Sequence, residues 1–188
     1  MKDFKIVWSA RSECGPNRKK NEDTIFPAIS GSSKPPFKAA VCDGLGGHVN
    51  GDVASKIAAD TLLKEITDLN QIITEANKNI LEYQDKNPSS LGMGTTMTAI
   101  SIDSDALMKI GHVGDSRCYV LSDRNLIKVT EDQNVPGYQN VLKQALGSNE
   151  KLNIQEVDFQ LQIGDVVFLC SDGLYNEFGE EYICLLYT

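Results

Sequence analysis

Short apolar runs separated by turn residues dominate the beginning of the chain. Two of these runs, Lys5 to Ala10 and Phe37 to Cys42, have the length and composition of β-strands. A polar segment from Gly31 to Pro36 separates them, and the second run stops abruptly at Asp43-Gly44. We therefore expect two strands joined by a loop, the second of which places an aspartate at its end.

The pattern then changes to a helical period. Apolar residues recur every three or four positions from Val53 to Ile66, and Asp52 stands where an N-cap is expected. A second helix is predicted from about Leu69 to Tyr83. Two consecutive helices are therefore expected after the aspartate-bearing strand.

Beyond Pro88 the chain is rich in strand signals, and a short helix is expected only around Asn140 to Leu146. The residues from Ser122 to Asn125 have the chemistry of a hairpin turn. Grouped helices among neighbouring antiparallel strands indicate an α+β fold rather than a parallel doubly wound sheet. The predicted strands of this half, the first four of them as a meander, are Thr95–Ile102, Leu107–Val113, Cys118–Leu121, Leu126–Val129, Leu152–Leu161 and Val166–Cys170.

Length and composition narrow the class of protein. The 188 residues, 41% of them hydrophobic, are expected to form a single domain spanning residues 1–188. The sequence has neither the roughly 18 apolar residues needed to span a bilayer nor a signal-peptide core, so we expect a cytoplasmic protein. The formal charge of -8 argues against nucleic acid or a membrane surface as a partner. The five cysteines lack a Cys-x-x-Cys pair and indicate neither a disulfide framework nor a zinc site.

Candidate chemistry lies at strand ends. Asp43-Gly44 and Asp172-Gly173 each follow an apolar strand, and a glycine lets the chain turn sharply beside the carboxylate. Asp115 stands at a third break between strands. Each pair alone is an ordinary turn dipeptide, but carboxylates without matching histidines or cysteines suit hard cations such as Mg²⁺ or Mn²⁺. Together they predict a metal site at one edge of the fold.

A charged segment near the amino terminus adds to this set. Arg18 precedes the adjacent acids Glu22 and Asp23. A guanidinium can hold two phosphate oxygens, and the acids could hold metal-bound water. Taken alone, the segment also fits a solvated charged loop. Combined with the strand-end aspartates, it supplies the parts for two-metal hydrolysis of a phosphate ester.

Six blocks of residues follow one another along nearly the whole chain: Gly15–Asp23, Val41–His48, Met93–Thr96, Val113–Tyr119, Gln144–Gly147 and Leu169–Leu174. In this order they resemble the metal-dependent (type 2C, or PPM-type) serine/threonine protein phosphatases, and their bacterial branch in particular. The resemblance implies a central sandwich of two antiparallel sheets flanked by helices, with two Mn²⁺ or Mg²⁺ ions at one end.

The resemblance also implies roles for individual residues. Asp43 would bridge both metals, the Gly44 carbonyl would bind one, and Asp172 would bind the other. Glu22 and Asp23 match acidic positions around the metals, partly through water. Arg18 matches the arginine that binds phosphate, and Asp115 matches a ligand of a weaker third metal. The implied activity is hydrolysis of phosphoserine and phosphothreonine in proteins by a metal-activated water, opposing a protein kinase.

The chain departs from the family pattern at several positions. Leu45 occupies the place of a proton-donating histidine, while His48 belongs to a variant of that block found in bacterial relatives. Asn176 replaces a second carboxylate of the third metal. The segment between Asp132 and Gln144, where a flap over the site usually lies, is short. The general acid is therefore not identified by the resemblance.

The largest departure concerns the closing Asp-Asn block of the family, which supplies another metal-binding aspartate on a late strand. No counterpart occurs before Thr188, so the chain has the pattern of a domain truncated at its C-terminus. This leaves an alternative from another class, a phosphoprotein-binding or regulatory pseudophosphatase with weak or no turnover.

Three other chemistries fit less well. Cys14 and Arg18 are four positions apart, not the six of a cysteine-dependent phosphatase loop. Asp103-Ser104-Asp105 resembles the start of an aspartyl-phosphate hydrolase motif, but Leu107 stands where that motif has threonine or valine. The segment from Gly44 to Val49 lacks the last glycine of a dinucleotide fingerprint, and Asp43 before it would repel a pyrophosphate.

Overall fold

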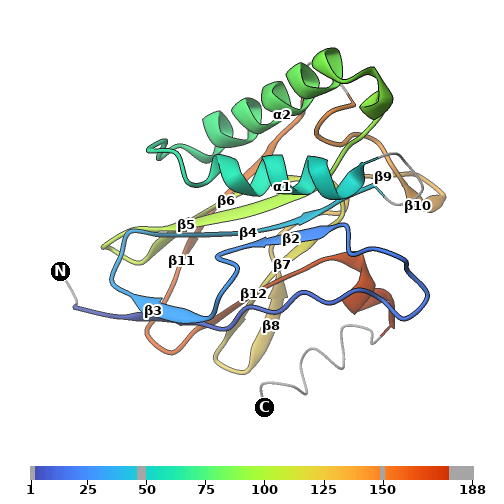
Figure 1. The fold of residues 1–188 in the computed structure, drawn as a ribbon. Helices are drawn as coiled ribbons and strands as arrows, with labels where there is room; N and C mark the ends of the chain where they lie inside the picture. The colour runs from blue at the N-terminus through green and yellow to red at the C-terminus, as the bar shows by residue number, and fades with distance from the viewer. Residues whose placement is uncertain (1–2, 46–49, 149–150, 178–188) are drawn as a thin grey trace.

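Two antiparallel sheets lie face to face, and two helices cover the outer face of the larger sheet (Figure 1). The structure is a computed structural model that describes residues 3–45, 50–148 and 151–177. Within these residues the larger sheet has the strand order β11-β6-β5-β4-β2 and the smaller β12-β7-β8, while β1-β3 and β9-β10 form separate pairs. The α+β sandwich expected from the sequence is confirmed. The elements are β1 (Ile6–Trp8), β2 (Asp23–Phe26), β3 (Gly31–Ser33), β4 (Phe37–Asp43), α1 (Gly51–Thr61), α2 (Leu69–Lys86), a 3-10 turn (Pro88–Ser90), β5 (Met97–Ile102), β6 (Leu107–Val113), β7 (Arg117–Ser122), β8 (Asn125–Lys128), β9 (Asn134–Val135), β10 (Tyr138–Leu142), β11 (Gln155–Gln160) and β12 (Val166–Cys170).

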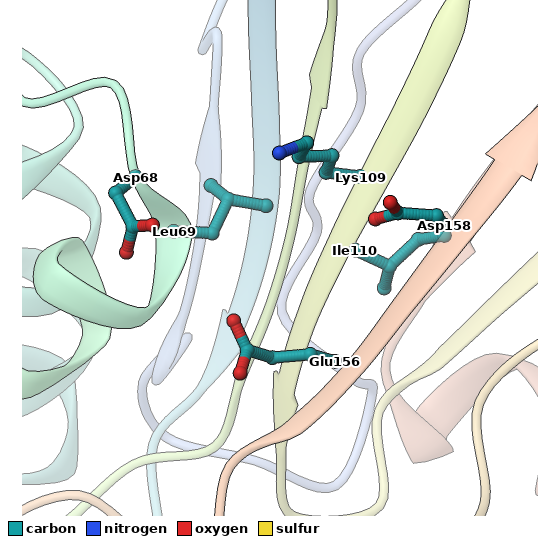
Figure 2. A pocket seen from close by; sticks show the side chains of 6 residues that line it. All are labelled: Asp68, Leu69, Lys109, Ile110, Glu156 and Asp158. Carbon is teal, nitrogen blue, oxygen red and sulfur yellow. The ribbon is translucent and has the colours of Figure 1, made fainter.

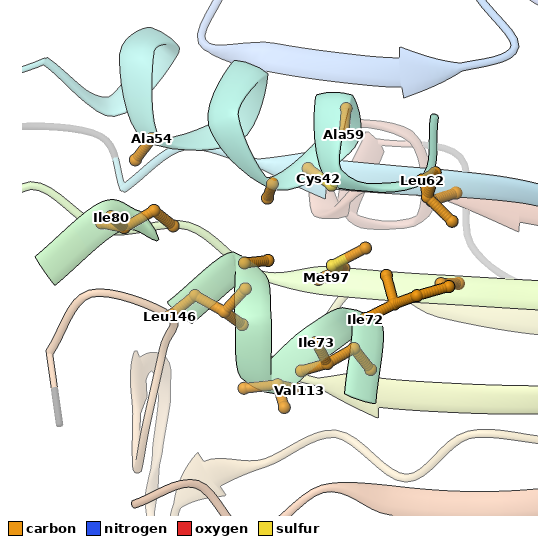
Figure 3. Close-up of a cluster of buried hydrophobic side chains, with 14 of the residues drawn as sticks. Cys42, Ala54, Ala59, Leu62, Ile72, Ile73, Ile80, Met97, Val113 and Leu146 are labelled. Carbon is orange, nitrogen blue, oxygen red and sulfur yellow. The ribbon is translucent and has the colours of Figure 1, made fainter. Parts of the chain in front are cut away.

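The hydrophobic core has two main layers because the larger sheet is covered on both faces. Between the sheets, Ile100 and Met108 of the larger sheet pack with Val120 of the smaller one. Between the larger sheet and the helices, Ile72 of α2 packs with Met97 of β5 and other fully buried side chains (Figure 3). Each buried aliphatic side chain of this kind contributes roughly 1.5–3 kcal/mol. This double burial makes the larger sheet a rigid platform for the residues at its edge.

Helix α1 differs from its prediction at both ends. It begins at Gly51 after Asn50, which has the left-handed conformation (φ 58°) and makes no side-chain cap. Asp52 lies inside the first turn, and its carboxylate pairs with Lys20 Nζ at 2.6 Å. The expectation that Asp52 caps this helix is therefore wrong, because its side chain is engaged by a lysine of the N-terminal segment.

The same helix ends at Thr61 rather than at Ile66. Beyond its end, Lys38 Nζ donates hydrogen bonds to the carbonyl oxygens of Leu62, Lys64 and Ile66 at 3.1, 3.1 and 2.9 Å. These carbonyls converge on one ammonium group, so the segment turns instead of continuing the helix. Helix α2 starts at the predicted residue and runs on to Lys86.

The short helix predicted around Asn140 to Leu146 is wrong, because that segment is extended. β9 and β10 pair antiparallel, with Tyr138 opposite Val135. Between them, Gly137 has φ 82°, a conformation that the second position of a Pro-Gly turn requires. The turn signal at Pro136-Gly137 therefore outweighs the apolar spacing that followed it.

The predicted meander of four strands is divided between the two sheets. β5 and β6 form a hairpin in the larger sheet, whereas β7 and β8 form one in the smaller. The chain crosses between the sheets at Gly114 to Ser116, which puts Asp115 at the edge of the sandwich. The hairpin turn between β7 and β8 is confirmed, since Asp123 and Arg124 both have positive φ.

Two strands of the first half of the chain escaped prediction because their signal is tertiary. β2 pairs with β4, and β3 pairs with β1 within the segment expected to be a loop. The ring of Trp8 lies so close to Gly31 that a Cβ there would be 2.7 Å from Trp8 Cζ2. Trp8 Nε1 also donates to the Ile29 carbonyl at 2.8 Å. Among the described residues, no helix is long and apolar enough to cross a bilayer.

Candidate metal centre

Asp43 and Asp23 form the centre of an acidic cluster at one end of the sandwich. They lie opposite each other in the register of β4 and β2, and their carboxyl groups form a hydrogen bond. Burial first, and then the charges of Asp23, Asp172 and Asp115, together raise the pKa of Asp43 to about 9. Without a cation, Asp43 therefore holds a proton near neutral pH.

The backbone of Asp43 is fixed by the two threonines after Gly94. Its amide donates to Thr96 Oγ1 at 3.0 Å, and its carbonyl accepts from Thr96 N at 2.8 Å and from Thr95 Oγ1 at 2.9 Å. Thr96 Oγ1 also lies 2.8 Å from Ser116 Oγ on the crossing between the sheets. The Met93–Thr96 block thus acts as a support for the aspartate at the end of β4.

Gly44 lies in a space that admits no side chain. A Cβ there would be 2.7 Å from the Glu22 carbonyl oxygen and would also overlap the Gly51 carbonyl. The Gly44 amide donates to the same Glu22 oxygen at 3.1 Å. Ser55 of α1 adds a hydrogen bond to that oxygen at 2.6 Å. The close packing of strand, loop and helix therefore explains the glycine after Asp43.

Glu22 points its carboxylate toward the beginning of α1. A Cβ at Gly51 would lie 3.0 Å from Glu22 Oε1, so this oxygen is next to the first residue of the helix. The positive end of a helix dipole favours such a carboxylate. Glu22 is thus held beside Gly44 and one residue from Asp23.

Asp172 reaches the cluster from the smaller sheet. Ser171, directly before it, donates a hydrogen bond to Asp23 Oδ2 at 2.7 Å and so ties the end of β12 to β2. Asn176 Nδ2 lies 3.3 Å from Asp172 Oδ2. The charge of Asp172 raises the pKa of Asp43, as described above. The two similar strand ends therefore meet, as the sequence predicted.

Asp115 is the fourth aspartate of the cluster. It is only 9% exposed, and burial, followed by the charge of Asp172, raises its pKa to about 6. The side-chain amide of Asn134 in β9 donates to Asp115 Oδ2 at 3.5 Å, which lowers the pKa of Asp115 but by less than burial raises it. Ser171 and Asn134 were absent from the predicted site. Ser171 lies within a recognised block, whereas Asn134 carries no local signal.

Arg18 is not in contact with these acids. It is exposed on a turn in which its amide donates to the Gly15 carbonyl at 2.9 Å, and it makes no ion pair with the described part of the chain. His48 lies outside the described residues. Leu45, in the place of the family's histidine, is fixed by its amide, which donates to Gly94 at 2.9 Å.

The donors fit hard divalent cations rather than zinc. The potential ligands of the cluster are carboxylate oxygens and the Gly44 carbonyl, and burial and like charges already disfavour the charged form of Asp43. In the described ranges, no three His, Cys, Asp or Glu side chains are already arranged so that they could hold a metal ion between them. Mg²⁺ commonly keeps several waters and binds one or two carboxylates, so an open arrangement suits it.

A pocket of about 390 Å³ lies elsewhere, between the start of α2 and strands β6 and β11 (Figure 2). Three acids border it, and one of them, Glu156, accepts a hydrogen bond from Asn70 Nδ2 at 3.1 Å. Lys109 extends into the same region. None of the predicted site residues lines this pocket, so it is separate from the acidic cluster.

The fold and the acidic cluster are those of a metal-dependent phosphatase. The chain belongs to the protein phosphatase 2C family, whose sequence profile matches residues 16–185. It is similar to the serine/threonine phosphatase Stp of Listeria monocytogenes, with 33% identity over 196 residues that cover 88% of this chain and 77% of the relative. A serine/threonine protein phosphatase PstP of Mycobacterium tuberculosis is 29% identical over 203 residues, covering 95% of this chain and 38% of that protein.

Solved structures agree with the sequence comparison. The catalytic domain of PstP in complex with two manganese ions superimposes with a TM-score of 0.83 and 28% identity, covering 97% of this chain and 84% of that one. The PstP/Ppp phosphatase of Mycobacterium tuberculosis gives a TM-score of 0.79 at 26% identity, covering 97% and 83%. The sandwich is therefore the catalytic-domain fold of this family.

Proposed function

We propose that this chain, as a single phosphatase domain, hydrolyses phosphoserine and phosphothreonine in proteins with the help of two Mn²⁺ or Mg²⁺ ions. The observation that carries the proposal is the convergence of Asp23, Asp43, Asp115 and Asp172 from both sheets. Gathering four acids at a partly buried site is unfavourable unless cations join them. The likeness to a phosphatase domain that binds two manganese ions supports the same conclusion.

We assign the roles of individual residues on this basis. Asp43 would bridge the two ions, with the Gly44 carbonyl on one and Asp172 on the other. Glu22 and Asp23 would complete the arrangement, partly through water. Their positions support this assignment, because Asp23 touches Asp43 and Glu22 lies beside Gly44.

Arg18 and Asp115 would act at the margins of the site. Arg18 is exposed and carries a guanidinium that can bind two phosphate oxygens of an arriving phosphoprotein. Asp115 would hold a weaker third ion. Asn176, in the place of a second carboxylate, would offer it only a neutral ligand. The bound cations would supply positive charge and lower the pKa of a water near the phosphorus.

The residues of the chain prepare the site for this chemistry. Asp43, whose pKa is raised by burial and by its neighbours, would hold the cations as a carboxylate, because their positive charge would favour loss of its proton. Thr95 and Thr96 keep its backbone fixed while the charge changes. Leu45 cannot donate a proton to the leaving serine or threonine oxygen, so that proton must come from water or another group.

The test is hydrolysis of a phosphothreonine peptide with and without Mn²⁺. We expect turnover that disappears with a chelator and falls at least about 100-fold in Asp43→Asn, because a metal ligand matters more than its outer partners. Asp85→Asn, which removes an exposed acid of α2, is the matched control and should leave turnover unchanged. Hydrolysis that resists chelation would contradict the proposal.

The same assay separates catalysis from binding alone. A phosphopeptide that binds in the presence of Mn²⁺ but is never hydrolysed would favour the pseudophosphatase. Our proposal further includes phosphoproteins made by an opposing protein kinase as substrates, and a cytoplasmic location. The opposing kinase rests on the resemblance to bacterial phosphatases of this family, and the location on the expectation from the amino-acid sequence.

A further inference from the structure

A cluster of charged and aromatic side chains lies directly behind Asp115 and Asp172. We call Arg117, Tyr119, Asp132 and Tyr175 the Arg117 cluster. The Arg117 guanidinium pairs with Asp132 at two points, Nη2 to Oδ2 at 2.6 Å and Nε to Oδ1 at 3.0 Å. The two side chains are only 15% and 22% exposed. A two-point pair shielded in this way is more rigid than an ion pair on the surface.

Tyr175 connects this cluster to both aspartates. The Arg117 Cζ atom lies 3.5 Å from the centre of the Tyr175 ring, which is cation–π geometry. The Tyr175 hydroxyl donates a hydrogen bond to the Asp115 carbonyl at 3.0 Å. Tyr175 itself lies in the helical residues 172–177 that follow β12, three positions after Asp172 (Figure 1). One buried side chain is therefore bonded to the backbone of one aspartate and sits on the same helical turn as the other.

The corner that carries Asp115 is held from its other side as well. The Gln133 amide donates to the Gly114 carbonyl at 2.8 Å, and the Gly114 amide donates to Gln133 Oε1 at 2.9 Å. Gln133 follows Asp132, the partner of Arg117, directly in the chain. Gly114 has φ 111°, which other residues rarely adopt. The residues after β8 and the helical turn after β12 therefore both form hydrogen bonds to the corner at Gly114 and Asp115.

We propose that Tyr175, held in place by Arg117 and Asp132, is a positioning residue that fixes the separation of Asp115 and Asp172 for cation binding. The inference rests on the proposed function, in which both aspartates face the ions. Two like charges repel each other, so their spacing is kept only by the surrounding structure. Tyr175 acts through the Asp115 backbone and touches neither the ions nor the phosphate.

The test compares Tyr175→Phe with Tyr119→Phe. The first keeps the ring under Arg117 and removes the bond to Asp115, whereas the second removes a hydroxyl that accepts from Arg117 Nη1 at 3.0 Å. Mn²⁺ binding measured by calorimetry should weaken about tenfold in Tyr175→Phe and less than twofold in Tyr119→Phe, because outer partners of metal ligands have effects of this size. Equal Mn²⁺ affinity in Tyr175→Phe and the unchanged protein would overturn the proposal, as would equal losses in both variants.

Turnover provides a second readout that a purely structural role would not change. In Tyr175→Phe the Mn²⁺ concentration for half-maximal phosphopeptide hydrolysis should rise about tenfold. The KM for the peptide at saturating Mn²⁺ should stay the same. A raised KM with an unchanged Mn²⁺ requirement would assign Tyr175 to substrate binding instead and refute the positioning role.

A third variant tests the support of Tyr175. Arg117→Lys keeps the charge but loses the two-point pair and the flat contact with the ring, so it should weaken Mn²⁺ binding as Tyr175→Phe does. Unchanged Mn²⁺ affinity in Arg117→Lys would refute this part.

The positioning role and the proposed function would be refuted by different results. Weaker Mn²⁺ binding in Tyr175→Phe, without phosphopeptide hydrolysis by any form, would leave the positioning role standing and remove the proposed function. No Mn²⁺ binding to the unchanged protein would remove both.

Discussion

The pairs Asp43-Gly44 and Asp172-Gly173 look alike in sequence, yet they lie in opposite surroundings. The first ends a strand of the larger sheet and the second follows a strand of the smaller one. A Cβ at Gly44 would be 2.7 Å from the Glu22 carbonyl oxygen, whereas a Cβ at Gly173 would meet no described atom within 4 Å. The same dipeptide therefore serves tight backbone packing in one place and an open helix start in the other.

The two aspartates are also supported by different chemistry. Short hydroxyl side chains hold the backbone of Asp43 on both sides. Around Asp172, the support comes from the Asn176 amide and from the helical turn that also carries Tyr175, whose hydroxyl donates to the Asp115 carbonyl. The difference follows from depth, since β4 is covered on both faces while β12 lies at the edge of its sheet.

Gly44→Ala tests the crowded strand end at Asp43-Gly44 and should have the largest effect on the free energy of unfolding. The added methyl would force the Glu22 and Gly51 carbonyls apart, and such overpacking against backbone should cost about 3 kcal/mol of unfolding free energy. Urea unfolding of the metal-free protein measures it, with Gly92→Ala as a comparison for strain at a glycine of positive φ in open space. A loss below about 1 kcal/mol would mean that the loop adjusts, and the contrast between the two glycines would disappear.

The acid of the same pair should make the metal-free protein less stable as pH rises. The folded-state pKa of Asp43 is about 9, above its ordinary value of 3.8, so the folded protein binds more protons than the unfolded chain between these values. Its contribution to stability is therefore present below about pH 4 and is lost as pH rises toward 9.

Asp43→Asn should consequently raise the unfolding free energy of the metal-free protein at pH 8 by about 2 kcal/mol, because it removes a buried acid at no cost in volume. Thermal unfolding in chelator at pH 5 and pH 8 measures the effect. Asp85→Asn is again the control, since Asp85 is exposed. A stability that is equal at both pH values in the unchanged protein would show that Asp43 is already ionised without metal.

Much of this contrast lies beyond what a single sequence can show. The strands that carry Asp43 and Asp172 were predictable, because apolar runs followed by Asp-Gly are local signals. The meeting of their ends was expected from the set of carboxylates at strand ends. The difference between Gly44 and Gly173 was not, because it depends on the carbonyls of Glu22 and Gly51, which come from other elements.

Three other features escaped prediction for the same reason. β3 forms because Trp8 lies against Gly31, a contact between segments far apart in the chain. The chain crosses from one sheet to the other at Gly114 to Ser116, which divided a predicted meander without changing any strand pattern. No local signal marks Tyr175, because its role depends on the hydrogen bond from its hydroxyl to the Asp115 carbonyl. Local periodicity thus predicts elements, whereas the supports of the site come from tertiary contacts.

Gly173→Ala tests the open strand end at Asp172-Gly173. It should have the smallest effect on the free energy of unfolding, and it should raise it rather than lower it. Gly173 lies within the helical residues 172–177 and has no described atom near its missing Cβ. Alanine loses less backbone entropy than glycine in a helix, so the variant should be more stable by about 0.5 kcal/mol, measured by urea unfolding. Phosphopeptide turnover should stay unchanged, because the substitution leaves the Asp172 carboxylate and its Asn176 partner in place. If Gly173→Ala instead lost 1 kcal/mol or more, Gly173 would be crowded as Gly44 is, and the two strand ends would be alike in packing as well as in sequence.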